Sequence, residues 1–176
     1  MIITFLQERD LELSDDKTLI TSINEGFDFL GWNFRKYNGK LLIKPSQKSI
    51  KRFTETISQT ITEGMAWSQE ILIAKLNPII RGWANYHNSV VSSDIFQTLD
   101  HRIWELLWKW AKRRHSNKSK DWIVNKYWKR STTRRWNFRT EKNSLLLLSK
   151  TRIVTIQPPP NQLANIDFDV IGTSDY

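Results

Sequence analysis

The sequence of 176 residues contains no cysteine. This excludes a disulfide framework and the zinc ribbons, knuckles and fingers whose ligands include cysteine thiolates. No run approaches the 18 or more apolar residues of a membrane-spanning helix, and the N-terminus has neither the basic region nor the apolar core of a signal peptide. We therefore expect a protein that is not secreted and has no membrane partner. Its expected location is the cytoplasm, or an organellar matrix or stroma if the gene is organellar.

Sequence motifs for catalysis and for nucleotide binding are also missing. Neither GxxxxGK[ST] nor GxGxxG, the glycine-rich loops that cradle phosphates, occurs in the chain. Only His101, of the three histidines, has an adjacent acid, Asp100, and consecutive residues of a helix do not face each other. We therefore predict no catalytic residue, no metal site and no cofactor.

Basic residues are concentrated in one third of the chain. The whole sequence has 27 Lys and Arg against 18 Asp and Glu, a formal net charge of +9. Residues 101–155 contain sixteen basic and three acidic residues, together with six of the nine tryptophans. Lys and Arg neutralise phosphates, while aromatic rings stack on unpaired bases. This composition favours a nucleic-acid-binding surface in the last third of the chain.

The six tryptophans of this region could serve either as core residues or as stacking platforms. Three lie in a strongly apolar helical pattern and are predicted to belong to the core: Trp104, Trp108 and Trp110. Three others are surrounded by Lys and Arg, and the pattern leaves both roles open for them: Trp122, Trp128 and Trp136.

The apolar pattern predicts strands first and helices afterwards. Residues 17–43 are rich in strand formers, and Asn38-Gly39 predicts a two-residue hairpin turn, whereas residues 2–11 predict a short helix. From residue 46 the period becomes helical. The expected helices are one from an N-cap at Ser46 to a stop at Gly64, one from Ser68, one from Ser93 to Arg114, and a short one from a cap at Ser119 to Trp128.

Proline and the distal sequence modify this scheme. Pro78 predicts a break or kink in the second helix, with Asn77 capping a new segment. Residues 136–139 and 145–154 predict strands joined by a polar turn at 141–144, and the three prolines from residue 158 predict an extended tail. The expected class is α+β, mainly α: a short N-terminal β-hairpin segment, a helical bundle, and a basic β-containing C-terminal region.

Several motifs in order resemble one family. FLQERDLELSDDKT, GFDFLGW and LLIKPS, in residues 5–46, are similar to the end of the palm of reverse transcriptases encoded by group II introns. RGWANYH and LDHRIWELLWKWAKRRHSNKSKDWI, in residues 81–123, resemble the maturase-specific thumb, or domain X, of that family. The resemblance implies four parts: residues 1–45 as the end of the palm, 46–130 as the thumb bundle, 131–155 as a basic β-containing appendage, and 156–176 as a Pro-rich acidic tail.

The resemblance implies an RNA-binding maturase domain that assists the folding and splicing of group II intron RNA. In the family the catalytic aspartates lie upstream of the FLQERD stretch, so we expect this chain to lack the polymerase active site and not to be an enzyme. Two alternatives stay open. The chain could be the C-terminal piece of a split or truncated reverse transcriptase that needs a separate palm fragment as partner, or an inactive remnant of a mobile element.

The partner implied is structured intron RNA, bound through its phosphate backbone and unpaired bases. One set of candidate contacts lies at the start of the first thumb helix: Lys44, Lys48, Lys51 and Arg52. A second set lies at the end of the third helix, in the following loop and beyond: Lys112, Arg113, Arg114, His115, Lys118, Lys120, Arg130, Arg134, Arg135 and Arg139. In the RGWANYH motif, Trp83 is predicted to be a core residue and Gly82 a close-packing position. The candidates for either RNA contact or a structural role are Arg81, Tyr86 and His87.

Overall fold

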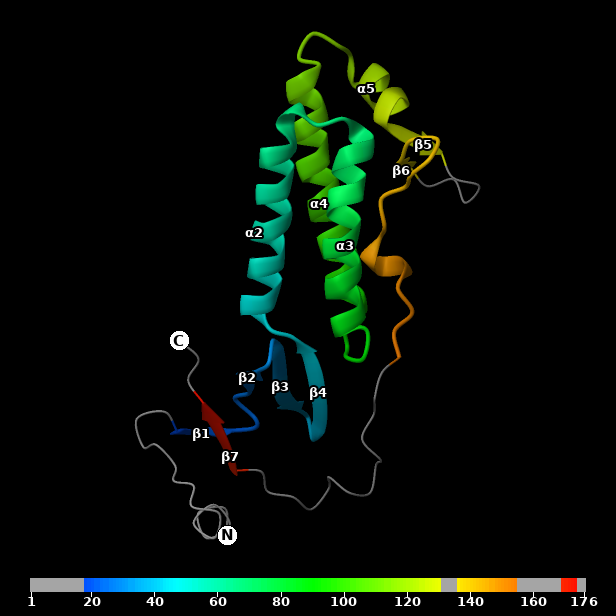
Figure 1. Ribbon diagram of the computed structural model, residues 1–176. Helices are drawn as coiled ribbons and strands as arrows, with labels where there is room; N and C mark the ends of the chain where they lie inside the picture. The colour runs from blue at the N-terminus through cyan, green and yellow to red at the C-terminus, as the bar shows by residue number, and fades with distance from the viewer. Residues whose placement is uncertain (1–17, 131–135, 155–168, 174–176) are drawn as a thin grey trace. The chain divides into compact units, whose positions relative to one another are not determined.

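The computed structural model describes residues 18–130, 136–154 and 169–173 (Figure 1). The chain divides into two compact units. One, the β unit, precedes residue 47 and resumes after residue 156; the other, the helical unit, comprises residues 47–156. The mainly helical α+β class is confirmed. The helix expected at 2–11, the motif in residues 5–17 and the proline run lie outside the described residues.

The β unit contains two small antiparallel sheets. In one, β1 (Thr18–Ser22) pairs with β7 (Asp169–Thr173). In the other, strands pair in the order β2 (Phe27–Phe29), β3 (Trp32–Tyr37) and β4 (Lys40–Pro45). The hairpin turn at Asn38-Gly39 is confirmed, with φ of 47° and 80°, the positive values that a tight primed turn requires. A second such turn, at Leu30 and Gly31, was not predicted from the sequence, because leucine rarely adopts positive φ.

The helical unit begins with three long helices whose ends agree closely with the sequence pattern. They are α2 (Gln47–Glu63), which continues into the 3-10 turn η2 (Gly64–Ala66), α3 (Gln69–His87) and α4 (Ser93–Arg114). A short helix, α5 (Lys120–Tyr127), follows. The cap predicted at Ser119 and the helix start predicted at Ser68 are confirmed, because each Oγ accepts a hydrogen bond at 3.3 Å from the amide three residues later.

The break expected at Pro78 is wrong, because α3 continues through it. Proline removes the hydrogen bond to the carbonyl of Ala74, and its ring crowds that carbonyl, but neither effect ends the helix here. Both residues are exposed, so water can reach that carbonyl. Asn77 caps no new helix; its side chain donates to the Ser144 carbonyl at 3.0 Å and accepts from the Leu146 amide at 2.9 Å.

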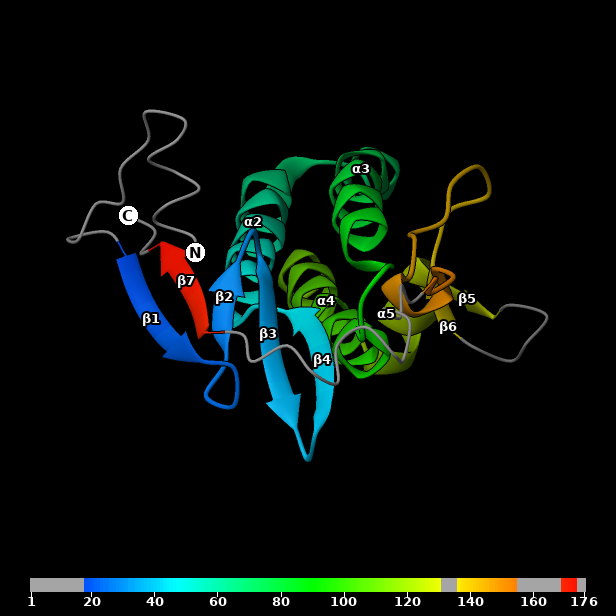
Figure 2. The ribbon, with the colours of Figure 1, turned by 90° about the horizontal axis from the view of Figure 1, so that it is seen from below.

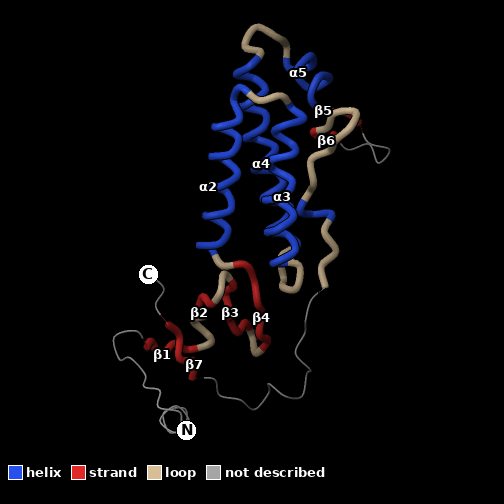
Figure 3. Tube along the Cα trace, viewed as in Figure 1, coloured by secondary structure: helices blue, strands red, loops and turns tan. Residues whose placement is uncertain are grey.

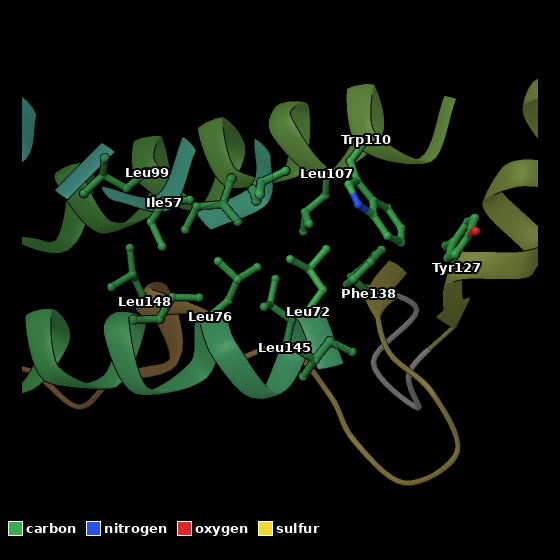
Figure 4. Close-up of a cluster of buried hydrophobic side chains, with 14 of the residues drawn as sticks. Ile57, Leu72, Leu76, Leu99, Leu107, Trp110, Tyr127, Phe138, Leu145 and Leu148 are labelled. Atoms are coloured by element: carbon green, nitrogen blue, oxygen red, sulfur yellow. The ribbon is translucent and has the colours of Figure 1, made fainter. Parts of the chain in front are cut away.

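The core of the helical unit lies between α2, α3 and α4, which surround a common centre when viewed end-on (Figure 2). Ile57, Leu76 and Leu107 are fully buried there, and Figure 4 shows such side chains from the three helices pointing toward one another. The wide apolar face of α4 packs against α2, α5 and η3 (Leu148–Lys150), as its width predicts.

The segment after α5 extends this core. Strands β5 (Trp128–Arg130) and β6 (Trp136–Phe138) form a short hairpin, and the turn expected at 141–144 is confirmed by a bridge between Arg139 and Ser144. The strand expected at 145–154 is wrong, since this stretch is a loop with one helical turn (Figure 3). The carboxylate of Asp100 on α4 accepts hydrogen bonds from the amides of Leu148 and Ser149, at 2.8 and 3.0 Å, and so fixes that turn.

Candidate nucleic-acid interface

Within the helical unit, Lys48, Lys51 and Arg52 of the first predicted set lie at the start of α2, and Lys112, Arg113 and Arg114 of the second set lie at the end of α4. The start of α2 lies beside the end of α3, where Ser49 Oγ is 3.0 Å from His87 Nε2. The end of α4 lies beside η2, near the end of α2 (Figure 1). At 1.5 Å per residue, the 17 residues of α2 separate the two ends by about 25 Å. Lys44 belongs to the β unit.

At the start of α2, Lys48, Lys51 and Arg52 are exposed. Lys51 Nζ lies 4.0 Å from Glu55 Oε1, so one of these charges is partly neutralised within the helix. Arg52 also lines a shallow cavity of about 270 Å³ between α2 and α3, together with apolar side chains that include Trp83. This set therefore forms a mixed surface, with three cations near an acid and an apolar groove.

The RGWANYH motif divides between surface and core. Arg81 and Tyr86 are exposed. The expected close packing at Gly82 is wrong, because a Cβ built there meets no atom within 4 Å. Trp83 packs against the core as predicted, stacked on Phe53 at 4.7 Å between ring centroids.

His87 takes the structural role. Only 1% of its surface is exposed, its ring lies 4.3 Å from that of Trp83, and its Nε2 is within hydrogen-bond distance of Ser49 Oγ. Burial lowers the pKa of His87 to about 4, so the ring is neutral at physiological pH. A buried neutral imidazole cannot attract phosphate. We therefore withdraw His87 as a candidate RNA contact.

The opposite end carries a denser cluster of cations. We define the α4–α5 corner as the last turn of α4, the loop after it and the exposed face of α5 (Figure 1). It comprises Lys112, Arg113, Arg114, Lys118, Lys120, Trp122 and Lys126, all of which are exposed. Within the described ranges of the chain, no ion pair neutralises any of its basic side chains. Its lysines and Arg113 therefore present their charge to solvent, beside one exposed acid, Asp121, in the first turn of α5.

Two candidates in this region also have structural contacts. Arg114 Nη1 donates to the carbonyls of Met65 and Trp67, at 2.6 and 3.0 Å, and thereby ties the end of α4 to η2. His115 Nε2 lies 2.7 Å from the hydroxyl of Tyr127. Partial burial lowers the pKa of His115, and the nearby cations, first Lys126, lower it further. The lowered pKa favours the neutral ring, so His115 adds less positive charge to this region than the lysines and arginines do.

The structure shows which of the six tryptophans of residues 101–155 lie in the core and which lie at the surface. Trp110 and Trp128 are core residues, each 2% exposed, and Trp108 is partly buried. The core role predicted for Trp104 is wrong, since that side chain is 41% exposed. Trp122 and Trp136, 38% and 44% exposed, are available at the surface.

A cavity of about 330 Å³ adjoins the corner at Lys126. Most of the basic residues that line this cavity were not predicted from the sequence. Its basic lining consists of Lys126, Lys129, Arg139 and Lys142, of which only Arg139 was a candidate. Arg139 Nε is buried and has no hydrogen-bond partner within the described parts of the chain. Lys126 was detectable, because it follows Trp122 at the i, i+4 spacing that aligns side chains on a helix. Arg134, Arg135 and the side chain of Arg130 lie outside what the structure describes.

Among the residues that the structure describes, no three His, Asp or Glu side chains gather as ligands for a metal ion. No helix formed by these residues combines the length and apolar character needed to cross a membrane.

Comparisons with known proteins agree with the geometry of the helical unit. The family model for the maturase-specific domain of group II introns matches residues 50–128. Maturase-like protein 1 of Euglena longa is 34% identical over 98 residues, which cover 54% of this chain and 21% of that protein. The protein of the same name from Euglena gracilis is 29% identical over 89 residues, covering 49% of this chain and 19% of that protein.

A further relative, ribosomal operon-associated A protein of Euglena longa, is 31% identical over 108 residues, or 61% of this chain and 21% of that protein. The chain thus spans about a fifth of the length of the curated relatives it matches. The matched segment contains α3, α4 and α5, nearly all of α2, and the whole α4–α5 corner. Residues 50–128 of this chain are therefore similar to the maturase-specific domain of group II introns.

Proposed function

We propose that the helical unit binds structured group II intron RNA and assists its folding and splicing as a maturase module. The observation that carries the proposal is the α4–α5 corner, a run of exposed cations without acidic partners among the described residues, inside the maturase-specific segment. The role proposed for the corner is binding, because its side chains supply positive charge and one exposed indole. We further propose that residues 1–45 correspond to the end of a reverse-transcriptase palm.

Affinity at such a surface comes mainly from the release of counterions from the RNA. Five corner cations make no side-chain hydrogen bond or ion pair within the described part of the chain: Lys112, Arg113, Lys118, Lys120 and Lys126. If each neutralises one phosphate, the plot of log K against log salt has a slope of roughly −3.5 on single strands and −4.5 on duplex. Binding should therefore weaken steeply as salt rises.

The test is binding of the purified chain to a structured group II intron RNA, with tRNA as competitor, over a salt series. The variant Lys112→Gln/Arg113→Gln/Lys118→Gln removes three corner charges. The matched control, Lys48→Gln/Lys51→Gln/Arg52→Gln, removes three charges at the other end of the helical unit. We expect intron-selective binding, and a slope that flattens by about 2 to 3 in the corner variant and by less in the control.

Two results would contradict the proposal. Equal competition by tRNA at every salt concentration would mean that the surface is generically basic, as expected for an inactive remnant. Equal loss of affinity in the two triple variants would mean that net charge, and not the corner, determines binding.

An exposed apolar turn favours a second candidate function, that of a piece of a divided reverse transcriptase. Phe29 is 48% exposed and Leu30 64% exposed at the β2–β3 turn of the β unit. Such side chains suit contact with a separate palm fragment. Co-expression with a palm fragment of a group II intron reverse transcriptase should yield a complex that Phe29→Ser and Leu30→Ser weaken. Recovery of the two chains as separate species would rule this candidate out.

A further inference from the structure

Trp122 lies at the centre of the α4–α5 corner, between two lysines. Lys118 Nζ is 5.5 Å and Lys126 Nζ 4.8 Å from the centroid of its ring. The ring of His115 meets the indole edge-on at 4.8 Å, which supports it from the protein side. The indole is thus held in place on one side, exposed on another, and surrounded by positive charge.

We infer that Trp122 is a stacking platform for an unpaired RNA base, whose flanking phosphates contact Lys118 and Lys126. This inference rests on the proposed function and specifies what the corner recognises: a single-stranded or looped-out nucleotide. A nucleobase stacks over the indole, and the two lysines swing from the ring to the phosphates on either side. The exchange is favourable, because base stacking on an aromatic ring is stronger than a solvent-exposed cation–π contact.

The cavity next to the corner suits the next phosphate of the same strand. Lys126 both contacts the Trp122 ring and lines the cavity, so it joins the two places. The cavity also brings together Lys129, Lys142 and Arg139, whose buried Nε has an unused hydrogen to donate among the described residues. Two acids, Glu70 and Glu141, also line the cavity, and Glu141 Oε1 lies 3.9 Å from Lys129 Nζ. Because the four basic residues outnumber the two acids, the lining keeps a net positive charge.

Trp104, an exposed tryptophan on α4, lacks these features. Trp104 stacks nearly parallel to His101 and Trp108, with interplanar angles of 7° and 5°. The acid on the same stretch of helix, Glu105, pairs with both His101 and Arg102. In the described part of the chain, no lysine lies over the Trp104 ring. Because its exposed fraction is close to that of Trp122, Trp104 provides a matched control.

The experiment uses the full chain and a heptauridylate whose central base is 2-aminopurine, a fluorescent base that is quenched when it stacks. The variants are Trp122→Leu, Trp122→Phe and Trp104→Leu. The wild type and Trp104→Leu should bind the probe and quench it. Trp122→Leu should bind about 5- to 100-fold more weakly and abolish the quenching, while Trp122→Phe should retain most of both, since it keeps an aromatic face.

A second measurement separates charge from stacking. Lys126→Gln should reduce the salt slope by about 0.7, the share of one phosphate on a single strand, yet leave the quenching at saturation unchanged. Thermal melting of each variant shows whether it folds. If Trp122→Leu does not fold, Trp122→Phe, which makes a smaller change, still tests the role of the aromatic ring.

The outcomes distinguish this inference from the proposed function. If Trp122→Leu and Trp122→Phe quench and bind like Trp104→Leu, or if the wild type binds intron RNA but not the probe, the platform is overturned while intron binding stands. If the wild type binds neither RNA, both proposals fail. Loss of quenching in Trp122→Leu alone, with intron binding weakened but still selective, would support both.

Discussion

The buried His87 predicts a specific dependence of stability on pH. Its pKa is about 4 in the folded protein and 6.5 as the reference value for an unfolded chain. Between these values the unfolded chain binds a proton that the folded chain excludes. Stability is therefore fully present above pH 6.5 and is lost as pH falls toward 4. The total loss is about 3 kcal/mol, of which about 2 kcal/mol falls between pH 7 and pH 5.

The variant His87→Gln isolates this effect. It lowers stability at pH 7, because the imidazole packs on Trp83, but it removes the titrating group. The difference in free energy of unfolding between wild type and variant should therefore shrink by about 2 kcal/mol from pH 7 to pH 5. Urea denaturation followed by circular dichroism at pH 7, 6 and 5 measures it.

Ser49→Ala is the control for this experiment, since it removes the hydrogen-bond partner of His87 but leaves the histidine to titrate. It should keep most of the wild-type pH dependence. The reasoning is refuted if wild type and His87→Gln lose stability in parallel between pH 7 and pH 5, because another group would then cause the loss.

Three further predictions concern the helical unit, and urea denaturation tests each. Gly64→Ala should cost about 1 to 3 kcal/mol, because its Cβ would lie 2.7 Å from the Trp67 ring; an unchanged midpoint would show that this ring moves freely. Pro78→Ala should raise stability by about 2 kcal/mol by restoring a helical hydrogen bond, and a loss would mean that the proline has a packing role. Arg114→Gln should cost about 1 kcal/mol for its bonds to η2, whereas Arg113→Gln should cost nothing measurable; equal effects would contradict the structural role of Arg114.

The ends of the helices were predictable because local chemistry determines them. Ser68 and Ser119 precede apolar periods at the spacing that an N-cap requires, and each side chain bonds the amide expected. The hairpin at Asn38-Gly39 was predictable for the same reason, since both residues tolerate positive φ. The turn at Leu30-Gly31 was not, because only strand pairing on both sides holds a leucine in that conformation.

The strand expected at 145–154 failed for a non-local reason. Its apolar alternation is suited to a strand, but a strand needs a neighbour whose backbone donors and acceptors are free. Instead, Asn77 and Asp100, far away in the sequence, take the amides of Leu146, Leu148 and Ser149. The same distant contacts explain why Asn77 does not cap a helix.

The sequence alone determined the helical periods, the concentration of basic residues and tryptophans in one third of the chain, and the motifs that resemble the maturase-specific domain. Each of these is a property of neighbouring residues, and so it can be read along the chain. Only the tertiary structure decided which aromatic rings are buried. The apolar face of α4 is wide, so that Trp110 is buried while Trp104, on the same helix, is 41% exposed. The tertiary structure likewise buries His87 and places the basic residues at the start of α2 about 25 Å from those at the end of α4. The direction and packing of whole helices decide which distant side chains meet.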